Sequence, residues 1–122
     1  MNNAISLILN ALILSLVLAL SHAILKWVSI QAYDDYLQLL LGKWPYIFTS
    51  LALYGLVFFY YIFVLRSSPI TALYPIYTGM SVLFVMLAGY LLFGESVAPY
   101  KIVGVFFILA GIILVGWNYG AQ

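Results

Sequence analysis

Residues 70–117 read ITALYPIYTGMSVLFVMLAGYLLFGESVAPYKIVGVFFILAGIILVGW, two long apolar runs separated by one short turn. A helix needs about 20 mostly apolar residues to cross the roughly 30 Å hydrocarbon core of a bilayer. The runs 70–93 and 97–117 have that length, and they lack the alternation of polar and apolar residues typical of membrane β-strands. This stretch therefore predicts two transmembrane helices joined by a tight turn at residues 94–96.

Two further apolar runs of spanning length precede this stretch, at residues 4–27 and 45–65. A short hairpin at residues 66–69 connects the second span to the third. The longest connection, residues 29–44, repeats apolar residues at helical spacing, which predicts either an extension of the first helix or a short interfacial helix. We therefore expect an all-α membrane protein, with residues 1–122 as one domain of four transmembrane helices, short loops and a dimeric assembly.

The composition supports this class and excludes several functions. Of 122 residues, 67% are hydrophobic and 6% are charged, whereas a soluble domain carries roughly 25% charged residues. A net charge of +1 without a basic cluster gives no positively charged surface for binding nucleic acid. With no cysteine and one histidine, neither a metal site nor a cofactor is predicted. Enzymatic activity is not expected, which leaves transport, channel activity or a role in assembly.

The positive charges barely favour one orientation in the membrane. Both termini and Arg66 are predicted on one side, whereas Lys43 and Lys101 lie on the other, with Lys26 flanking that side. The positive-inside rule compares the number of lysines and arginines on the two sides of the membrane. Here the side opposite the termini has two or three, and the side with the termini has one. Insertion in both orientations is therefore a hypothesis for this chain.

Polar residues of the first span follow helical spacing. Ser15, His22, Lys26 and Ser29 fall on one stripe of a helix, which predicts that they face a bundle interior or another subunit. Lysine is a compact cation suited to phosphate, so Lys26 and His22 are candidates for binding an anionic headgroup. Alternatively, Lys26 extends to the membrane interface without binding substrate. Glu95 is predicted on the same side, where it could pair with Lys26.

The third span contains a proline followed by a glycine one turn later. Pro75 removes a backbone donor, so Pro75 and Gly79 predict a kink or hinge. Tyr74 and Tyr77 are three residues apart on one face, where their hydroxyls could bind a polar ligand or their rings could form a packing surface. Both interpretations remain open from the sequence.

The fourth span carries two glycines seven residues apart, Gly104 and Gly111. Small residues at this spacing let two membrane helices approach closely. We predict that these glycines form a dimer contact.

Four motifs resemble the drug/metabolite transporter superfamily in its four-helix form. They are SHAILK at 21–26, SPITALYP at 68–75, LFGES at 92–96 and GVFFILAG at 104–111. The resemblance implies four transmembrane helices and a transport function over nearly the whole chain. It includes two branches with different substrates.

The first branch is that of small multidrug resistance exporters, which the chain resembles in size and in the glycine spacing. The resemblance implies an antiparallel homodimer, but the carboxylate those exporters need corresponds to Leu18 here. The second branch comprises small flippase subunits for aminoarabinose-phosphoundecaprenol, which the chain resembles more closely. Its members act as unlike pairs, so this resemblance leaves homodimer and heterodimer both open.

The sequence thus predicts a transporter in the bacterial inner membrane that flips a lipid-linked anionic sugar by alternating access. Phosphate would lie by Lys26 and His22, and the sugar would lie against Tyr74, Tyr77 and Glu95. One alternative is a small multidrug-type exporter of cationic or polar molecules, with proton coupling moved to His22 or Glu95. Another is an accessory membrane subunit that does not itself transport.

Overall fold

The structure is a computed structural model that describes residues 2–117, and every regular element in that range is a helix. Four of the five helices are long and apolar enough to cross a membrane. The predicted all-α fold with four transmembrane helices is therefore confirmed. The helices are α1 (Asn2–Ser29), α2 (Tyr36–Gly42), α3 (Trp44–Leu65), α4 (Ile70–Phe93) and α5 (Pro99–Gly116).

Proline and glycine set several helix boundaries. Pro45 and Pro99 occupy the first turns of α3 and α5, where a missing N–H costs nothing. Ala98 before Pro99 is extended, with ψ 152°, as expected for a residue that precedes proline. For this reason α5 begins at Pro99, two residues later than the predicted span. At the other end of the chain, α1 continues to Ser29, two residues beyond its predicted span.

The connection between α1 and α3 contains a separate short helix and not a continuation of α1. Asp35 caps α2, because its side chain accepts a hydrogen bond of 3.0 Å from the backbone N–H of Gln38. Lys43 follows α2, with its Nζ 5.1 Å from the ring centre of Trp27 and 5.6 Å from that of Tyr46. These cation–π contacts tie the connection to the ends of α1 and α3.

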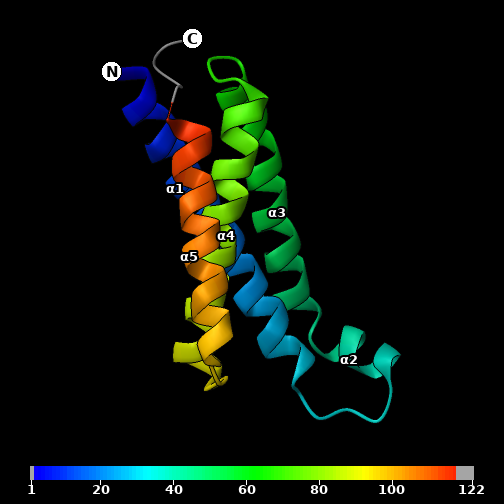
Figure 1. The fold of residues 1–122 in the computed structure, drawn as a ribbon. Coiled ribbons are helices and arrows are strands. Elements are labelled where there is room, and N and C mark those ends of the chain that lie inside the picture. Colours follow the sequence, from blue (N-terminus) through cyan, green and yellow to red (C-terminus); the bar gives the residue numbers. More distant parts are fainter. Residues whose placement is uncertain (1, 118–122) are drawn as a thin grey trace.

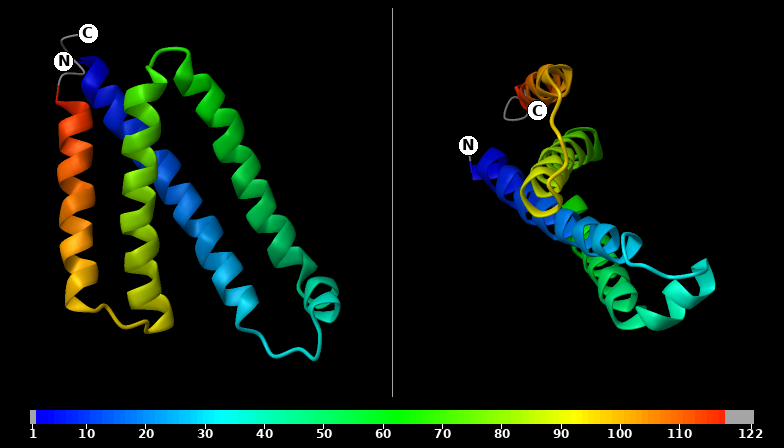
Figure 2. Two further views of the ribbon diagram at one scale, coloured as in Figure 1. Left: turned by 45° about the vertical axis from the view of Figure 1, so that its right-hand side comes forward. Right: turned by 90° about the horizontal axis from the view of Figure 1, so that it is seen from below.

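Helix α1 lies between α3 and α4, and α5 packs along α4 at the edge of the bundle (Figure 1). Figure 2 shows α4 and α5 nearly parallel, with α1 crossing α4 at an angle. The start of α1, the α3–α4 hairpin and the end of α5 lie at one end of the bundle. The other end, with α2 and the α4–α5 turn, is called the α2 end below.

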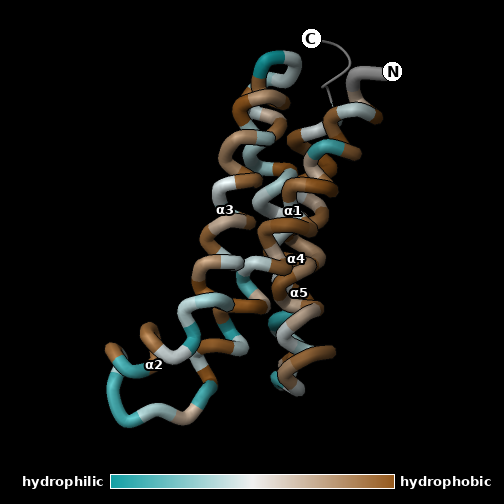
Figure 3. The backbone as a smooth tube through the Cα atoms, turned by 180° about the vertical axis from the view of Figure 1, so that it is seen from behind, coloured by the Kyte–Doolittle hydropathy of each residue, from teal (hydrophilic) through white to brown (hydrophobic). Residues whose placement is uncertain are grey.

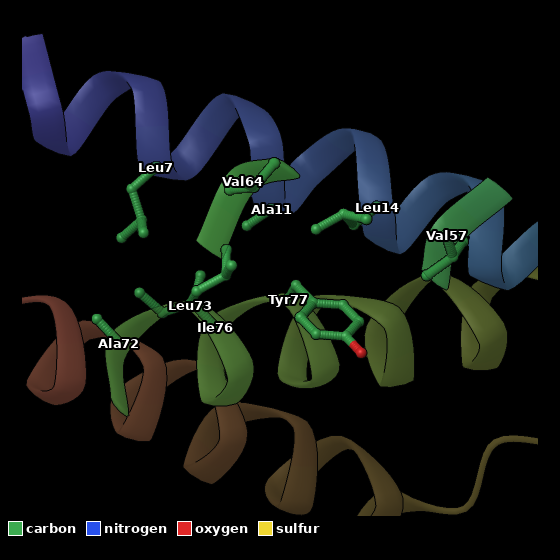
Figure 4. Packing of buried hydrophobic residues seen from close by; sticks show 9 residues of the cluster. All are labelled: Leu7, Ala11, Leu14, Val57, Val64, Ala72, Leu73, Ile76 and Tyr77. Carbon is green, nitrogen blue, oxygen red and sulfur yellow. The ribbon is translucent and has the colours of Figure 1, made fainter. Parts of the chain in front are cut away.

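A cluster of buried apolar side chains from α1, α3 and α4 forms the core in the half of the bundle near the α3–α4 hairpin (Figure 4). Leu73 and Ala11 are fully buried there. In lipid, such packing stabilises helix association mainly through van der Waals contact. The cluster comprises Leu7, Ala11, Leu14, Val57, Val64, Ala72, Leu73, Ile76 and Tyr77.

Many large apolar side chains of the four long helices are exposed, and hydrophilic residues concentrate near the helix ends and in the connection that holds α2 (Figure 3). No residue of α5 over Pro99–Gly116 is buried, so this helix contributes little to the core. An apolar exterior of this kind matches a lipid environment. The chain is a multi-pass membrane protein.

Helix α4 continues through Pro75 without a break, and Gly79 lies where α4 meets α5. A Cβ atom at position 79 would be 2.7 Å from Cδ1 of Ile112. Close packing therefore explains Gly79 in this conformation, and the predicted hinge at Pro75 and Gly79 stays a prediction.

Replacing Gly79 with leucine is expected to destabilise the protein by about 1–3 kcal/mol, because the added side chain must push Ile112 and α5 away. Thermal unfolding in detergent measures the effect as a lower Tm. Gly55→Leu is the matched control, since nothing lies within 4 Å of a Cβ at that position. Equal Tm values for the two variants would contradict the packing role of Gly79.

Candidate functional site

An ion pair joins α1 to the turn after α4 at the α2 end of the bundle. Nζ of Lys26 lies 3.5 Å from Oε1 of Glu95, and the two side chains are 45% and 50% exposed. Lys26 occupies the last turn of α1, where the helix dipole favours a cation. The pairing expected from the sequence is therefore present, at the boundary between the span and the α4–α5 turn.

Two glycines position the Glu95 carboxylate. Gly94 ends α4 in the left-handed conformation, with φ 64°, and the backbone N–H of Glu95 donates to the carbonyl of Gly89 over 3.1 Å. The turn brings the carboxylate back onto α4, where a Cβ at position 89 would be 2.7 Å from Oε2 of Glu95. Gly89 thus leaves the space that the carboxylate occupies.

Replacing Gly94 with alanine is expected to cost about 1–2 kcal/mol, because an L side chain is strained in the left-handed region. The measurement is Tm in detergent, with Gly94→Asn as the control, since asparagine tolerates this conformation better. An alanine variant as stable as the wild type would contradict the role assigned to the turn.

The ion pair borders a small pocket between α1 and α4 of about 120 Å³. Three polar side chains line it, two from α1 and one from the turn after α4, and its other lining residues are small or apolar. The volume accommodates a few water molecules or one compact group. The lining residues are Ala19, His22, Ala23, Lys26, Val85, Ala88, Gly89, Phe93 and Glu95.

His22 connects this pocket to α3. The hydroxyl of Tyr54 lies 3.2 Å from Nδ1 of His22, and the two rings meet edge to face at 5.6 Å between centres. Sequence reasoning identified His22 but missed Tyr54. The signal was the spacing of Ser50, Tyr54 and Val57, which repeats on the α3 face that turns toward α1.

Two buried serines hold α1 against α3 next to this pocket. The hydroxyls of Ser21 and Ser50 are 2.7 Å apart, and each also bonds to the other residue's carbonyl oxygen over 3.0 Å. Both residues are fully buried. Small polar residues allow this close approach of two membrane helices, and sequence reasoning did not identify the pair.

The predicted polar stripe of α1 divides in the structure. Ser15 is fully buried and donates to the carbonyl of Leu12 over 2.8 Å, whereas Ser29 is exposed and donates to the carbonyl of Lys26 over 2.7 Å. Both serines therefore satisfy their hydroxyls within α1. Only His22 and Lys26 of the stripe line the pocket.

Tyr74 and Tyr77 lie in the other half of the bundle. Tyr77 is 9% exposed and belongs to the core, with its ring centre 5.7 Å from that of Tyr74 and 5.2 Å from that of Tyr61. Tyr77 precedes Phe93 by 16 residues of α4, or about 24 Å of helix rise. The predicted substrate-binding residues therefore form two separate groups in this conformation, and the role of the two tyrosines in binding substrate stays a prediction.

The glycines of α5 face open space. A Cβ at Gly104 or Gly111 would meet no atom within 4 Å, so packing within the described chain requires neither glycine. Their assignment to a dimer contact remains a prediction.

Four apolar helices with short connections, and a charged pair beside a pocket at one membrane end, fit a small four-helix membrane transporter. The chain is 34% identical over 73 residues to a protein of Enterobacter sp. (strain 638) described as "Probable 4-amino-4-deoxy-L-arabinose-phosphoundecaprenol flippase subunit ArnE". The match covers 60% of this chain and 67% of the relative. The chain belongs to the family of this flippase subunit.

Two other comparisons gave no match. No protein-family model matches the chain, and no solved structure matches it.

Proposed function

We propose that the protein flips a lipid-linked anionic sugar, or a similar polar lipid, across the bacterial inner membrane by alternating access. The observation that carries the proposal is the pocket at the α2 end, where Lys26, His22 and Glu95 meet. Family membership supports a lipid as the transported molecule, because the relative's description names a phosphoundecaprenol carrier.

The chemistry of the pocket suits a phosphate group. An ammonium group donates charge-assisted hydrogen bonds to phosphate oxygens, which is the role we assign to Lys26. His22 adds a ring nitrogen next to Lys26, and Tyr54 positions that ring through its hydroxyl. A charged headgroup is costly in hydrocarbon, so a cation at the membrane boundary lowers the cost of entry.

The sugar and the hydrocarbon tail require other surfaces. The polyprenyl tail would stay in lipid beside the apolar outer faces of the helices. Tyr74 and Tyr77 would contact the sugar at a second stage, in the other half of the bundle. This movement would use the hinge at Pro75 and Gly79.

An oligomer would enclose the pathway, since four helices alone enclose little space. We propose a dimer formed through α5 at Gly104 and Gly111. The absence of a side chain at these positions leaves room for a second helix to approach, and no atom of the described chain lies within 4 Å of a Cβ built there. The partner is either a second copy or an unlike chain, and the word subunit in the relative's description supports the second arrangement.

Native mass spectrometry of the protein released gently from its membrane tests the proposal. We expect a dimer, or a complex with an unlike chain, that retains a mass of polyprenyl-phosphate type. Protein that is consistently free of such a lipid, when control membrane proteins retain theirs, would contradict it.

Two alternatives give different outcomes in further assays. A multidrug-type exporter would bind lipophilic cations such as tetraphenylphosphonium with a strong dependence on pH, although Leu18 occupies the position of the coupling carboxylate. An accessory subunit would be inert in proteoliposomes without a partner chain. Weak cation binding that does not vary with pH would exclude the exporter. Transport by the purified chain alone would exclude the accessory subunit.

A further inference from the structure

The Glu95 carboxylate occupies the same corner of the pocket that an anionic ligand of Lys26 would need. Lys26 and Glu95 both line the pocket, and their side chains meet across it. Carboxylate and phosphate present the same chemistry to an ammonium group, namely anionic oxygens that accept its hydrogen bonds. One cation cannot give both its full set of close contacts.

We infer that Glu95 is a placeholder for the anionic headgroup, which binds Lys26 by displacing the Glu95 carboxylate. This inference rests on the proposed function, because it assigns a competing role to one residue of the same site. It makes Glu95 a specificity-determining residue, since only a ligand with anionic oxygens can replace the carboxylate at Lys26.

The geometry of the pair suits exchange. The contact of 3.5 Å is longer than the 2.7–2.9 Å typical of charge-assisted hydrogen bonds, and both side chains are about half exposed. Ion pairs of this kind contribute little to stability. The carboxylate is also carried by the turn that begins at Gly94, outside any helix, so it can leave without disturbing the helical hydrogen bonds of α4.

Exchange would also loosen one helix contact and leave another intact. The ion pair connects α1 to the end of α4, whereas Ser21 and Ser50 hold α1 to α3 by buried hydrogen bonds. Apart from the ion pair, small residues such as Ala23 and Ala88 line the pocket between α1 and α4. Headgroup binding would therefore replace the ion pair between α1 and the α4–α5 turn and leave the α1–α3 hydrogen bonds in place.

Binding of dodecyl phosphate to the full-length protein in a non-ionic detergent, measured by titration calorimetry, tests the inference. We expect Glu95→Gln to bind about threefold more tightly than the wild type, because a weak internal competitor is removed. Unchanged or weaker binding by Glu95→Gln would overturn the placeholder role and indicate that Glu95 helps to hold the ligand.

One further variant separates the carboxylate of Glu95 from its contribution to the net charge. Asp34→Asn removes one negative charge on the same membrane side and should leave the affinity unchanged. If Asp34→Asn matched Glu95→Gln, net charge would explain the result and the inference would fail.

Lys26→Ala distinguishes this inference from the proposed function. It should abolish binding in both the wild-type and the Glu95→Gln backgrounds. Binding that persists without Lys26 would contradict the proposed headgroup site itself, whatever the effect of Glu95.

Discussion

Replacing Lys26 with alanine is expected to weaken binding of a polyprenyl-phosphate lipid by at least tenfold, with the fold intact. Hydrogen bonds to charged groups contribute about 1.5–3 kcal/mol, which corresponds to a factor of roughly 10 or more in affinity. Stability should change little, because Lys26 is half exposed and its ion pair with Glu95 is loose. Lipid retention in native mass spectrometry and Tm in detergent provide the two measurements.

Lys101→Ala is the matched control for this variant. Lys101 also lies at the α2 end, exposed, with its Nζ 3.5 Å from the carbonyl of Ser96. It does not line the pocket, so lipid retention should stay near the wild-type level. Equal losses in the two variants would mean that general attraction to anionic lipid, and not the pocket, explains binding.

Replacing Ser50 with leucine is expected to cost about 3 kcal/mol of stability, the largest effect on folding among the variants considered. Position 50 is fully buried against α1, and an enlarged side chain in a tight contact costs about 1–3 kcal/mol. The change also removes the hydrogen bonds with Ser21, worth about 0.6 kcal/mol each on average within membranes.

Thr49→Leu tests whether burial causes this effect. Thr49 precedes Ser50 but is exposed, and its hydroxyl donates to the carbonyl of Pro45 within α3. A leucine there would face lipid and should be nearly neutral. Unfolding followed by circular dichroism in mixed detergent compares the variants, and a Ser50→Leu protein as stable as Thr49→Leu would refute the α1–α3 contact.

The spans could be predicted because uninterrupted apolar length is itself the signal for a membrane helix. The pairing of Lys26 with Glu95 was also predictable, since the first and third spans cross the membrane in the same direction and therefore end on the same side. The helix boundaries that proline sets were harder to predict. The late start of α5 follows from the steric restriction that Pro99 imposes on Ala98.

The rest of the site depended on packing that periodicity does not specify. Ser21 and Ser50 are small polar residues in apolar runs, and nothing in either run indicates which residue of another helix lies opposite. The separation of Tyr77 from Glu95 could be read from the sequence, because the rise along α4 already sets it. Face and height along a helix must be considered together when a membrane site is predicted.

The most direct test of the central claim measures transbilayer movement of a fluorescent polyprenyl-phosphate sugar in proteoliposomes. The protein is reconstituted with any chain that co-purifies with it, and a reagent quenches the outer leaflet only. The account predicts rapid protein-dependent loss of the inner-leaflet signal, which Lys26→Ala abolishes and Lys101→Ala preserves. Movement no faster than in protein-free liposomes, or equally fast with Lys26→Ala, would contradict it.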